Sequence, residues 1–197
     1  MDERRIIAVP RIVAVPAPLR VKVRLAHSSN FARTPTEKSN VCLHATHGAE
    51  GPNKDDDEAA QLQKPDHGVS FHYVVDSNSA TRCVPDLYVA WHARRTANAR
   101  CLGVELCGRA DQSRDQWFDA VSLATLNIAA RLVADICKEH KIPAEFCGPD
   151  ELRAGKRGIT THEACSKAWK ESDHWDPGPH FPLTEFIAAV KVALTVV

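Results

Sequence analysis

The stretch CLGVELC, residues 101–107, decides the fold class because it has the pattern of a buried strand. Its apolar side chains, Leu102, Val104 and Leu106, alternate with smaller or polar ones. Successive side chains of a strand point to opposite faces of its sheet, so these three share a packed face and Glu105 projects from the other face. A short β-branched and apolar run of this kind predicts a sheet with one covered face.

Two further runs show the same period of two, NVCLHA at 40–45 and VSFHYVVD at 69–76. In the first run His44 faces away from the apolar side chains. In the second run every other side chain from Val69 to Val75 is expected on one face. A weaker strand is expected at 81–84, paired with the second run through a turn at 77–78.

Helices are expected after these strands. From Arg114 to His140 apolar residues recur every three or four positions and form one stripe. Ser113 is a suitable N-cap for this helix. A last helix is expected over 184–194. Strands and helices mix along the chain, which predicts an α/β fold with a central mixed β-sheet flanked by helices.

The 197 residues fit one domain. Residues 1–25 alternate apolar pairs with Pro and Arg, and we interpret them as an extended arm or linker that can add an edge strand. Residues 26–197 are expected to form the domain itself. Residues 48–66 are polar and acidic and are expected to form a surface loop with one short helix. The formal net charge is zero, which argues against electrostatic binding to nucleic acid or membranes.

Seven cysteines, an odd number without a CxxC pair, favour reduced thiols and a cytoplasmic site of synthesis. No apolar run approaches the roughly 20 residues of a membrane span, so no membrane insertion is expected. Pro10, Arg11 and Pro16 interrupt the apolar N-terminal segment. A signal peptide is therefore not expected.

Ionisable side chains on two of the predicted strands point to chemistry. His44 and Glu105 each project away from a packed face, so they share one side of the sheet if their strands are neighbours. Gly103 removes a side chain from that same side and is expected to leave room for a ligand.

Two more candidates lie late in the chain. His162 follows a short β-branched run in RGITTHEAC (157–165), and Asp176 stands in the Pro-rich loop ESDHWDPGPHFP (171–182). Pro177 restricts the backbone of Asp176, so the loop is expected to be rigid. Two His and one carboxylate are a catalytic zinc set with water in the fourth position. They are equally the non-haem iron triad, and residue types alone do not separate the two metals.

Other candidates keep two interpretations at this stage. His47 lies three positions after His44, so on a continued strand it faces away from it, and beyond the strand its place is open. His92, in AWHAR, suits the wall of a substrate site or a plain surface. Cys165 is expected to be a buried thiol rather than a ligand.

Six motifs follow one another along residues 27–183: VCLHAT (41–46), SFHYVVD (70–76), VAWHA (89–93), NARCLGVEL (98–106), ITTHEA (159–164) and HWDPGPHFP (174–182). In this order they resemble the zinc-dependent N-acetylmuramoyl-L-alanine amidases of type 2, which are similar in fold to peptidoglycan recognition proteins. The wording is most like that of amidase domains from endolysins of actinobacterial phages. A non-catalytic peptidoglycan-binding module of the same fold is the alternative.

The resemblance implies one zinc ion held by His44, His162 and Asp176. It implies Glu105 as the general base. His174 stands where the family often has Lys, and we expect it to support the oxyanion. Phe71 stands where some members have a catalytic Tyr, so no phenol can act there.

The resemblance also implies substrate contacts from His72, His92 and Asn98. The expected substrate is the bond between the lactyl group of N-acetylmuramic acid and L-alanine in bacterial peptidoglycan. We expect a monomeric endolysin that is made in the host cytoplasm and acts on the host cell wall.

Overall fold

The computed structural model describes residues 11–16 and 18–195. The strands are β1 (Val21–Val23), β2 (Phe31–Ala32), β3 (Asn40–Ala45), β4 (Tyr73–Val75), β5 (Ala80–Arg82), β6 (Val89–Ala90), β7 (Cys101–Leu106) and β8 (Gly158–Thr161). The helices are the 3-10 turn η1 (Ser28–Asn30), α1 (Lys54–Leu62), α2 (Arg94–Arg100), α3 (Arg114–Trp117), α4 (Ala120–His140), α5 (Pro149–Arg153), α6 (His162–Trp169) and α7 (Leu183–Thr195).

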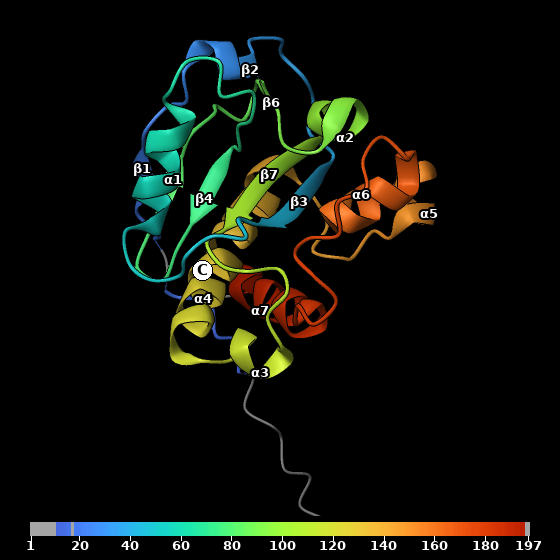
Figure 1. Cartoon of the computed structure of the whole chain (residues 1–197). Coiled ribbons are helices and arrows are strands. Elements are labelled where there is room, and N and C mark those ends of the chain that lie inside the picture. Colours follow the sequence, from blue (N-terminus) through green and yellow to red (C-terminus); the bar gives the residue numbers. More distant parts are fainter. Residues whose placement is uncertain (1–10, 17, 196–197) are drawn as a thin grey trace, which may run out of the picture.

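Six strands form one mixed sheet in the order β1-β5-β4-β7-β3-β8 (Figure 1). Only the β4–β5 pair is antiparallel; the other neighbours run parallel. β2 and β6 form a separate antiparallel pair. The predicted α/β class with a central mixed sheet is confirmed, and so is the pairing of the 69–76 run with the weaker strand after it.

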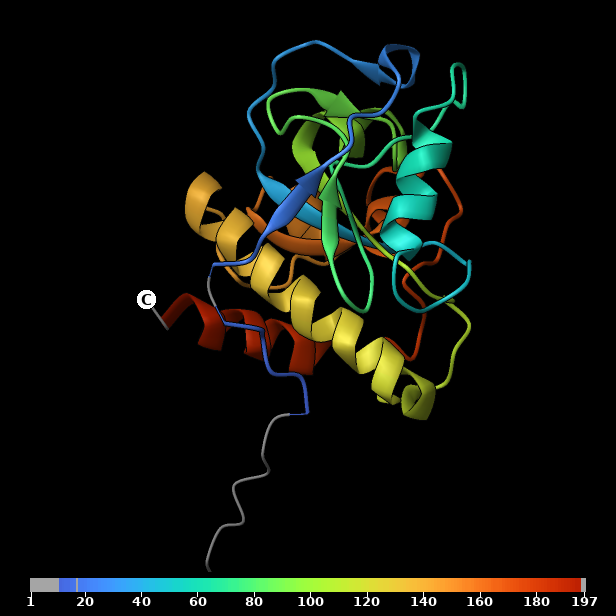
Figure 2. The same cartoon turned by 90° about the vertical axis from the view of Figure 1, so that its left-hand side faces the viewer.

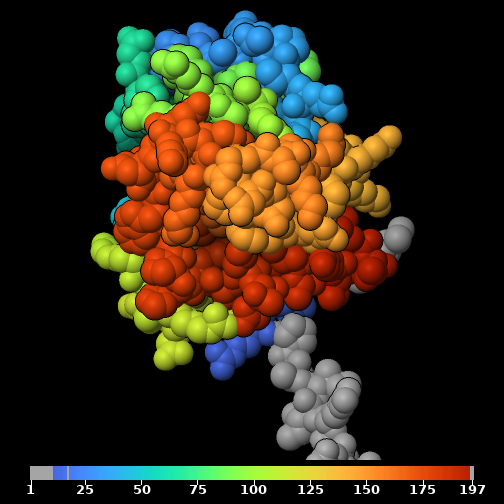
Figure 3. All heavy atoms as spheres, turned by 90° about the vertical axis from the view of Figure 1, so that its right-hand side faces the viewer, coloured from blue at the N-terminus to red at the C-terminus, as the bar shows by residue number. Residues whose placement is uncertain are grey.

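One face of the sheet is closed by α4 and α7, which lie side by side beneath it in Figure 2. Leu43 of β3 and Leu102, Val104 and Leu106 of β7 are fully buried in this core. Their burial confirms the predicted alternation in both strands. The other face is covered by α1 beside β4 and β5, by α2 beside β7, and by α6 beside β3 and β8. In the space-filling view from the right-hand side of Figure 1, α5, α6 and α7 lie next to one another (Figure 3).

The helix predicted from Arg114 to His140 is two helices. Ser113 caps α3 as expected, in a capping box with Gln116. The chain then leaves the helix at Phe118, and the side chain of Asp119 accepts hydrogen bonds from the N–H groups of Val121 and Ser122 in the first turn of α4. A carboxylate that satisfies these N–H groups begins a new helix, which the continuous apolar stripe did not reveal.

The strand predicted over 69–76 is shorter than expected, because β4 begins only at Tyr73. The carbonyl of His72 instead accepts from the backbone N–H groups of Cys83 and Val84. Phe71 therefore leaves the face that Tyr73 and Val75 share and packs in a second cluster. This difference matters below, because it places Phe71 beside His44.

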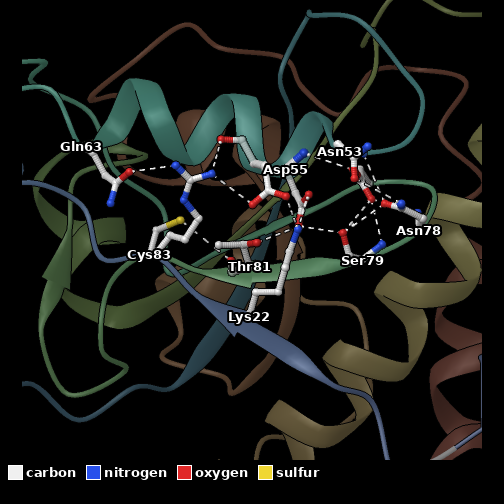
Figure 4. A network of polar contacts seen from close by, with 11 residues as sticks. Lys22, Asn53, Asp55, Gln63, Asn78, Ser79, Thr81 and Cys83 are labelled. Carbon is white, nitrogen blue, oxygen red and sulfur yellow. Dashed lines mark hydrogen bonds and ion pairs between the residues drawn. The ribbon is translucent and has the colours of Figure 1, made fainter.

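Residues from the predicted N-terminal arm lie against the domain. β1 forms the edge of the sheet beside β5, and Ile12 is buried in the main core. Figure 4 shows the polar network that joins β1 to α1. Lys22 Nζ lies 3.0 Å from the buried carboxylate of Asp55, which also accepts hydrogen bonds from Ser79 and Thr81. The arm thus supplies the edge strand, and the boundary at residue 25 stays a prediction.

Within the described residues, α4 is long and apolar enough to cross a membrane by length and composition, with a mean hydropathy of 1.5. The expectation that no run approaches this length is therefore corrected. In the structure 67% of the most apolar 18-residue segment of α4 is buried inside the domain, as is usual for a core helix. All seven cysteines are buried free thiols, as expected, and none forms a disulfide.

Candidate active site

Neighbouring strands place two of the predicted side chains together. β3 and β7 pair in parallel with His44 opposite Glu105, so both side chains leave the same face of the sheet. His44 is 2% exposed and Glu105 is 3% exposed. The sequence prediction that an imidazole and a carboxylate share this face is confirmed.

His162 reaches the same place from the other neighbour of β3. β8 ends at Thr161, whose hydroxyl accepts a hydrogen bond from the Ala164 N–H and caps α6. His162 is thus the first residue of α6, directly beyond a strand that pairs with β3. Its ring centroid lies 4.7 Å from that of His44.

The loop after α6 delivers Asp176. Its carbonyl accepts a hydrogen bond from the Glu163 N–H at 3.1 Å, and its peptide bond to Pro177 is cis. Gly178 has a φ of +103°, and a Cβ there would lie 1.8 Å from the carbonyl oxygen of Ala110. Only glycine fits this contact, so the loop passes closer to the backbone of Ala110 than any other residue would allow.

Three polar side chains meet at one point. Asp176 Oδ2 lies 3.0 Å from His44 Nδ1, and Asp176 Oδ1 lies 3.1 Å from His162 Nδ1. The three side chains are a group of buried donors that could hold a metal ion. Zinc bonds of about 2.0–2.1 Å in a tetrahedron put ligand atoms about 3.3 Å apart. The observed spacing therefore fits a zinc ion after small shifts of the side chains.

The pKa values of the two carboxylates in the site are shifted in opposite directions. Burial would raise the pKa of Asp176, but hydrogen bonds from His162 and His44 outweigh it and hold that pKa well below its usual range. Burial raises the pKa of Glu105 well above its ordinary value; His44 opposes this and Asp176 adds to it. One carboxylate is thus held as an anion, whereas the other takes up a proton more readily.

His174 lies at the open side of the group and its side chain is 58% exposed. Its ring stacks on that of His162, with centroids 4.4 Å apart and planes at 9°. Its Nδ1 lies 3.5 Å from Asp176 Oδ1. His47 follows the end of β3 in a left-handed backbone conformation and packs against Trp175. Cys165 is a buried thiol 3.8 Å from Cys42, as expected.

The space beside Gly103 is filled by protein. A Cβ on Gly103 would lie 2.7 Å from Cγ of His92, so the glycine makes room for that ring and the expected room for a ligand is wrong. His92 is 8% exposed, and its Nδ1 lies 2.9 Å from Nε2 of His44.

The substrate contacts predicted for His72 and Asn98 do not match their positions. His72 is fully buried, with Nδ1 accepting from the Gly103 N–H and Nε2 beside the carbonyl of Tyr88. Asn98 Oδ1 accepts from the N–H groups of His92 and Ala93. Both side chains therefore hold the wall of the site from behind.

A cleft of about 430 Å³ opens over the His–Asp group. His44, Glu105, His162, His174 and Asp176 all line it, together with Phe71 and His92. Its volume is within the range of about 300–1,000 Å³ for ligand sites.

Sequence reasoning missed two charged side chains of the cleft wall. Glu58 projects from α1, which is the short helix expected within the surface loop of residues 48–66, and burial raises its pKa. The apolar residues Ala59 and Leu62 were the sequence signal that this segment packs on the domain, and both are buried in α1. Arg94, at the start of α2, has a left-handed φ of +68°, which is uncommon for a residue with a side chain.

A mixed α/β sheet that carries two His and two carboxylates into an open cleft defines an α/β enzyme domain with a candidate metal site. The particular family follows from comparison: residues 34–179 match the family model for N-acetylmuramoyl-L-alanine amidase, and the chain belongs to that family. The predicted amidase resemblance is confirmed at this level.

Relatives support the same assignment. A Bacillus licheniformis protein described as a probable N-acetylmuramoyl-L-alanine amidase is 31% identical over 111 residues, which are 51% of this chain and 27% of that protein. The chain therefore matches about a quarter of the relative's length.

Solved structures share the fold at low identity. Staphylococcus aureus hydrolase AmiA, solved with its ligand, superposes with a TM-score of 0.68 at 19% identity, covering 91% of this chain and 88% of that one. A mutant endolysin from Bacillus subtilis gives 0.61 at 21% identity, covering 88% and 99%. The predicted amidase type 2 fold is confirmed.

Proposed function

We propose that this chain hydrolyses the amide between the lactyl group of N-acetylmuramic acid and L-alanine of the stem peptide in bacterial peptidoglycan. The observation that carries the proposal is the convergence of His44, His162 and Asp176 at the floor of a cleft that Glu105 and His174 also line. Membership of the amidase family supports the bond that is cut.

His44, His162 and Asp176 are the residues that would hold a zinc ion. Two imidazole nitrogens and one carboxylate oxygen are a known catalytic zinc set, and their spacing fits it. Bound zinc would supply Lewis acidity and would lower the pKa of water from 15.7 to about 7.

Glu105 is the proposed general base. It takes a proton from the attacking water and later gives that proton to the leaving amine of L-alanine. Its raised pKa suits both steps, since a base must also release its proton within one turnover. It lines the cleft from the strand beside His44.

His174 is proposed to support the negative charge that develops on the attacked carbonyl oxygen. It is the most exposed of these side chains and lies against both His162 and Asp176. A donor in this position strengthens its hydrogen bond only as charge develops, which is how such groups lower a barrier.

The test is a digest of purified peptidoglycan analysed by mass spectrometry. The proposal expects stem peptides with a free N-terminal L-alanine and intact glycan strands. Cleavage at another bond would overturn it. Tight binding without any cleavage would establish the alternative, a non-catalytic peptidoglycan-binding module of the same fold.

Elemental analysis tests the metal separately. About one zinc per chain is expected, and chelation should abolish cleavage and lower the Tm because the metal binds the native state. Iron in place of zinc would assign the two His and Asp to the non-haem iron triad instead.

We also propose that the domain acts as an endolysin on the host cell wall, after synthesis in the host cytoplasm. The wording LRAGKRGITTH and HWDPGPHFP within residues 152–182, which resembles that of actinobacteriophage endolysins, supports this part of the proposal. Purified protein added to actinobacterial cells with permeabilised envelopes should lower their turbidity. Cleavage of isolated peptidoglycan without lysis of such cells would contradict the lytic role while leaving the amidase activity intact.

A further inference from the structure

The two ring nitrogens of His44 have separate partners. Nδ1 faces Asp176 at 3.0 Å, on the side where the three donor atoms meet. Nε2 faces Nδ1 of His92 at 2.9 Å, on the opposite side. His162 shows the same division, since its Nδ1 faces Asp176 and its Nε2 lies 3.4 Å from the hydroxyl of Ser172. Each of the two candidate histidine ligands therefore has one second partner behind it.

The position of His92 is determined from two sides. Its backbone N–H and that of Ala93 both donate to Asn98 Oδ1, at 2.9 and 2.7 Å, which holds the loop before α2. Its ring lies in the space that Gly103 leaves on β7, where a Cβ would come within 2.9 Å of Nδ1 itself. A glycine in the middle of a central strand thus serves to admit this ring.

The position of the proton on His44 decides which ring donates the hydrogen bond between His44 and His92. A neutral imidazole that offers the Nδ1 lone pair to a metal carries its proton on Nε2. His44 therefore donates through Nε2, and His92 accepts through Nδ1. Ligand histidines usually donate to a carboxylate, a backbone carbonyl or water, and here a second histidine takes that place.

We propose that His92 is a positioning residue that fixes the ring orientation and tautomer of His44 for zinc binding. The inference rests on the proposed function, because it assumes that His44 is a zinc ligand. It replaces the substrate contact predicted for His92 from the sequence. It also assigns Gly103 and Asn98 to one unit whose purpose is to hold that acceptor.

The experiment measures zinc affinity of the purified protein by competition with a chromogenic chelator. His92→Ala and His92→Leu remove the acceptor, the second while filling much of the space. His92→Asn keeps an acceptor oxygen close to the position of Nδ1 but leaves part of the space empty. Both non-polar variants are expected to bind zinc roughly 10–100-fold more weakly, and the Asn variant is expected to recover most of the loss.

A purely structural role predicts the opposite order. If His92 only packs, His92→Leu should bind zinc better than His92→Asn, and that order would overturn the proposal. Phe71→Leu is the matched control, since Phe71 also packs against the His44 ring, with centroids 5.3 Å apart, but makes no hydrogen bond to it. It is expected to keep the zinc affinity of the wild type.

A double-mutant cycle tests the part assigned to Gly103. Gly103→Ala should lower the Tm by displacing the His92 ring, but in the His92→Ala background the added methyl group has room. The two changes should therefore be strongly non-additive. Additive effects would show that Gly103 does not serve His92.

The outcomes separate this inference from the proposed function. Tight zinc binding by the wild type with the packing order of variants overturns the role of His92 and leaves the amidase proposal standing. A wild type that binds zinc but cleaves no peptidoglycan overturns the amidase proposal and leaves the variant order to decide on His92. A wild type that takes up no zinc overturns both.

Discussion

The two faces of the sheet at β3 and β7 have opposite chemistry, although the residues that form them are direct neighbours in the sequence. Leu43 is followed by His44, and Glu105 by Leu106. The leucines are fully buried under α4, whereas His44 and Glu105 line the cleft. One strand thus builds the core and the site at once, and the alternation of side chains keeps the two apart.

The difference between the faces has an energetic consequence. Leu43 and Leu106 stabilise the fold by leaving water. Glu105 is also buried, and its raised pKa means that its ionised form is disfavoured in the folded protein. The cleft face therefore lowers stability at neutral pH, and changes on the two faces should separate activity from stability.

The largest effect is expected from Glu105→Gln. Loss of the general base should lower kcat roughly 10²–10⁴-fold with zinc content unchanged. The Tm of the metal-free protein at neutral pH should rise, because the carboxylate that folding disfavours is gone. Since the pKa of Glu105 is raised in the folded state, the destabilisation grows as pH rises above the unfolded value of about 4.3, so the gain in Tm should shrink towards pH 4. Wild-type turnover in this variant would contradict the base assignment.

The neighbouring core residue should give the converse result. Leu43→Ala removes a fully buried side chain and should lower the free energy of unfolding by about 2–5 kcal/mol. Activity per folded molecule should stay near wild type, because the residue faces α4. Urea unfolding and a peptidoglycan assay at low temperature measure the two quantities. A loss of kcat as large as that of Glu105→Gln would show that the two faces are not independent.

His174 tests the exposed edge of the cleft face. His174→Ala should lower kcat roughly 10²–10³-fold, as the loss of one oxyanion donor does, with little change in Tm or zinc content. His174→Lys should recover part of the rate. If the Ala variant loses its zinc, His174 is a ligand, and the assignment of Asp176 within HWDPG needs revision.

The smallest effect concerns the thiols below the cleft face. Cys42 and Cys165 lie close together, yet no disulfide joins them or any other pair among the seven cysteines. A reducing agent should therefore leave the Tm unchanged, as measured by thermal unfolding with and without it. A clear drop would reveal bridges in the purified protein.

The sequence was most informative where local periodicity decides the structure. The alternation in residues 101–106 and 40–45 predicted both strands and placed His44 and Glu105 on one face. The loop around Asp176 could be predicted from its prolines and glycine, but the contact of Gly178 with Ala110 could not, since 68 positions separate the two residues.

Long-range contacts account for what could not be predicted. The order of the six strands depends on pairs far apart in the chain, and β1 is too short to show a clear period. The place of His92 depends on a glycine in another element, so the motif VAWHA gave no indication that its histidine lies behind His44. The break between α3 and α4 at Phe118 is a local feature. It could not be predicted, because Asp119 is also compatible with the exposed polar side of one continuous helix.

The distance in sequence between His44 and Asp176, 132 positions, has a consequence for synthesis. β3 is made early, Glu105 follows in the middle of the chain, and the last candidate ligand comes late. A nascent chain therefore has no complete ligand set until residue 176 has left the ribosome and the parallel strands have paired, which is a slow step for contacts of such separation. A chain that stops before this loop lacks one of the three candidate ligands, so the candidate metal site is complete only when the fold is complete.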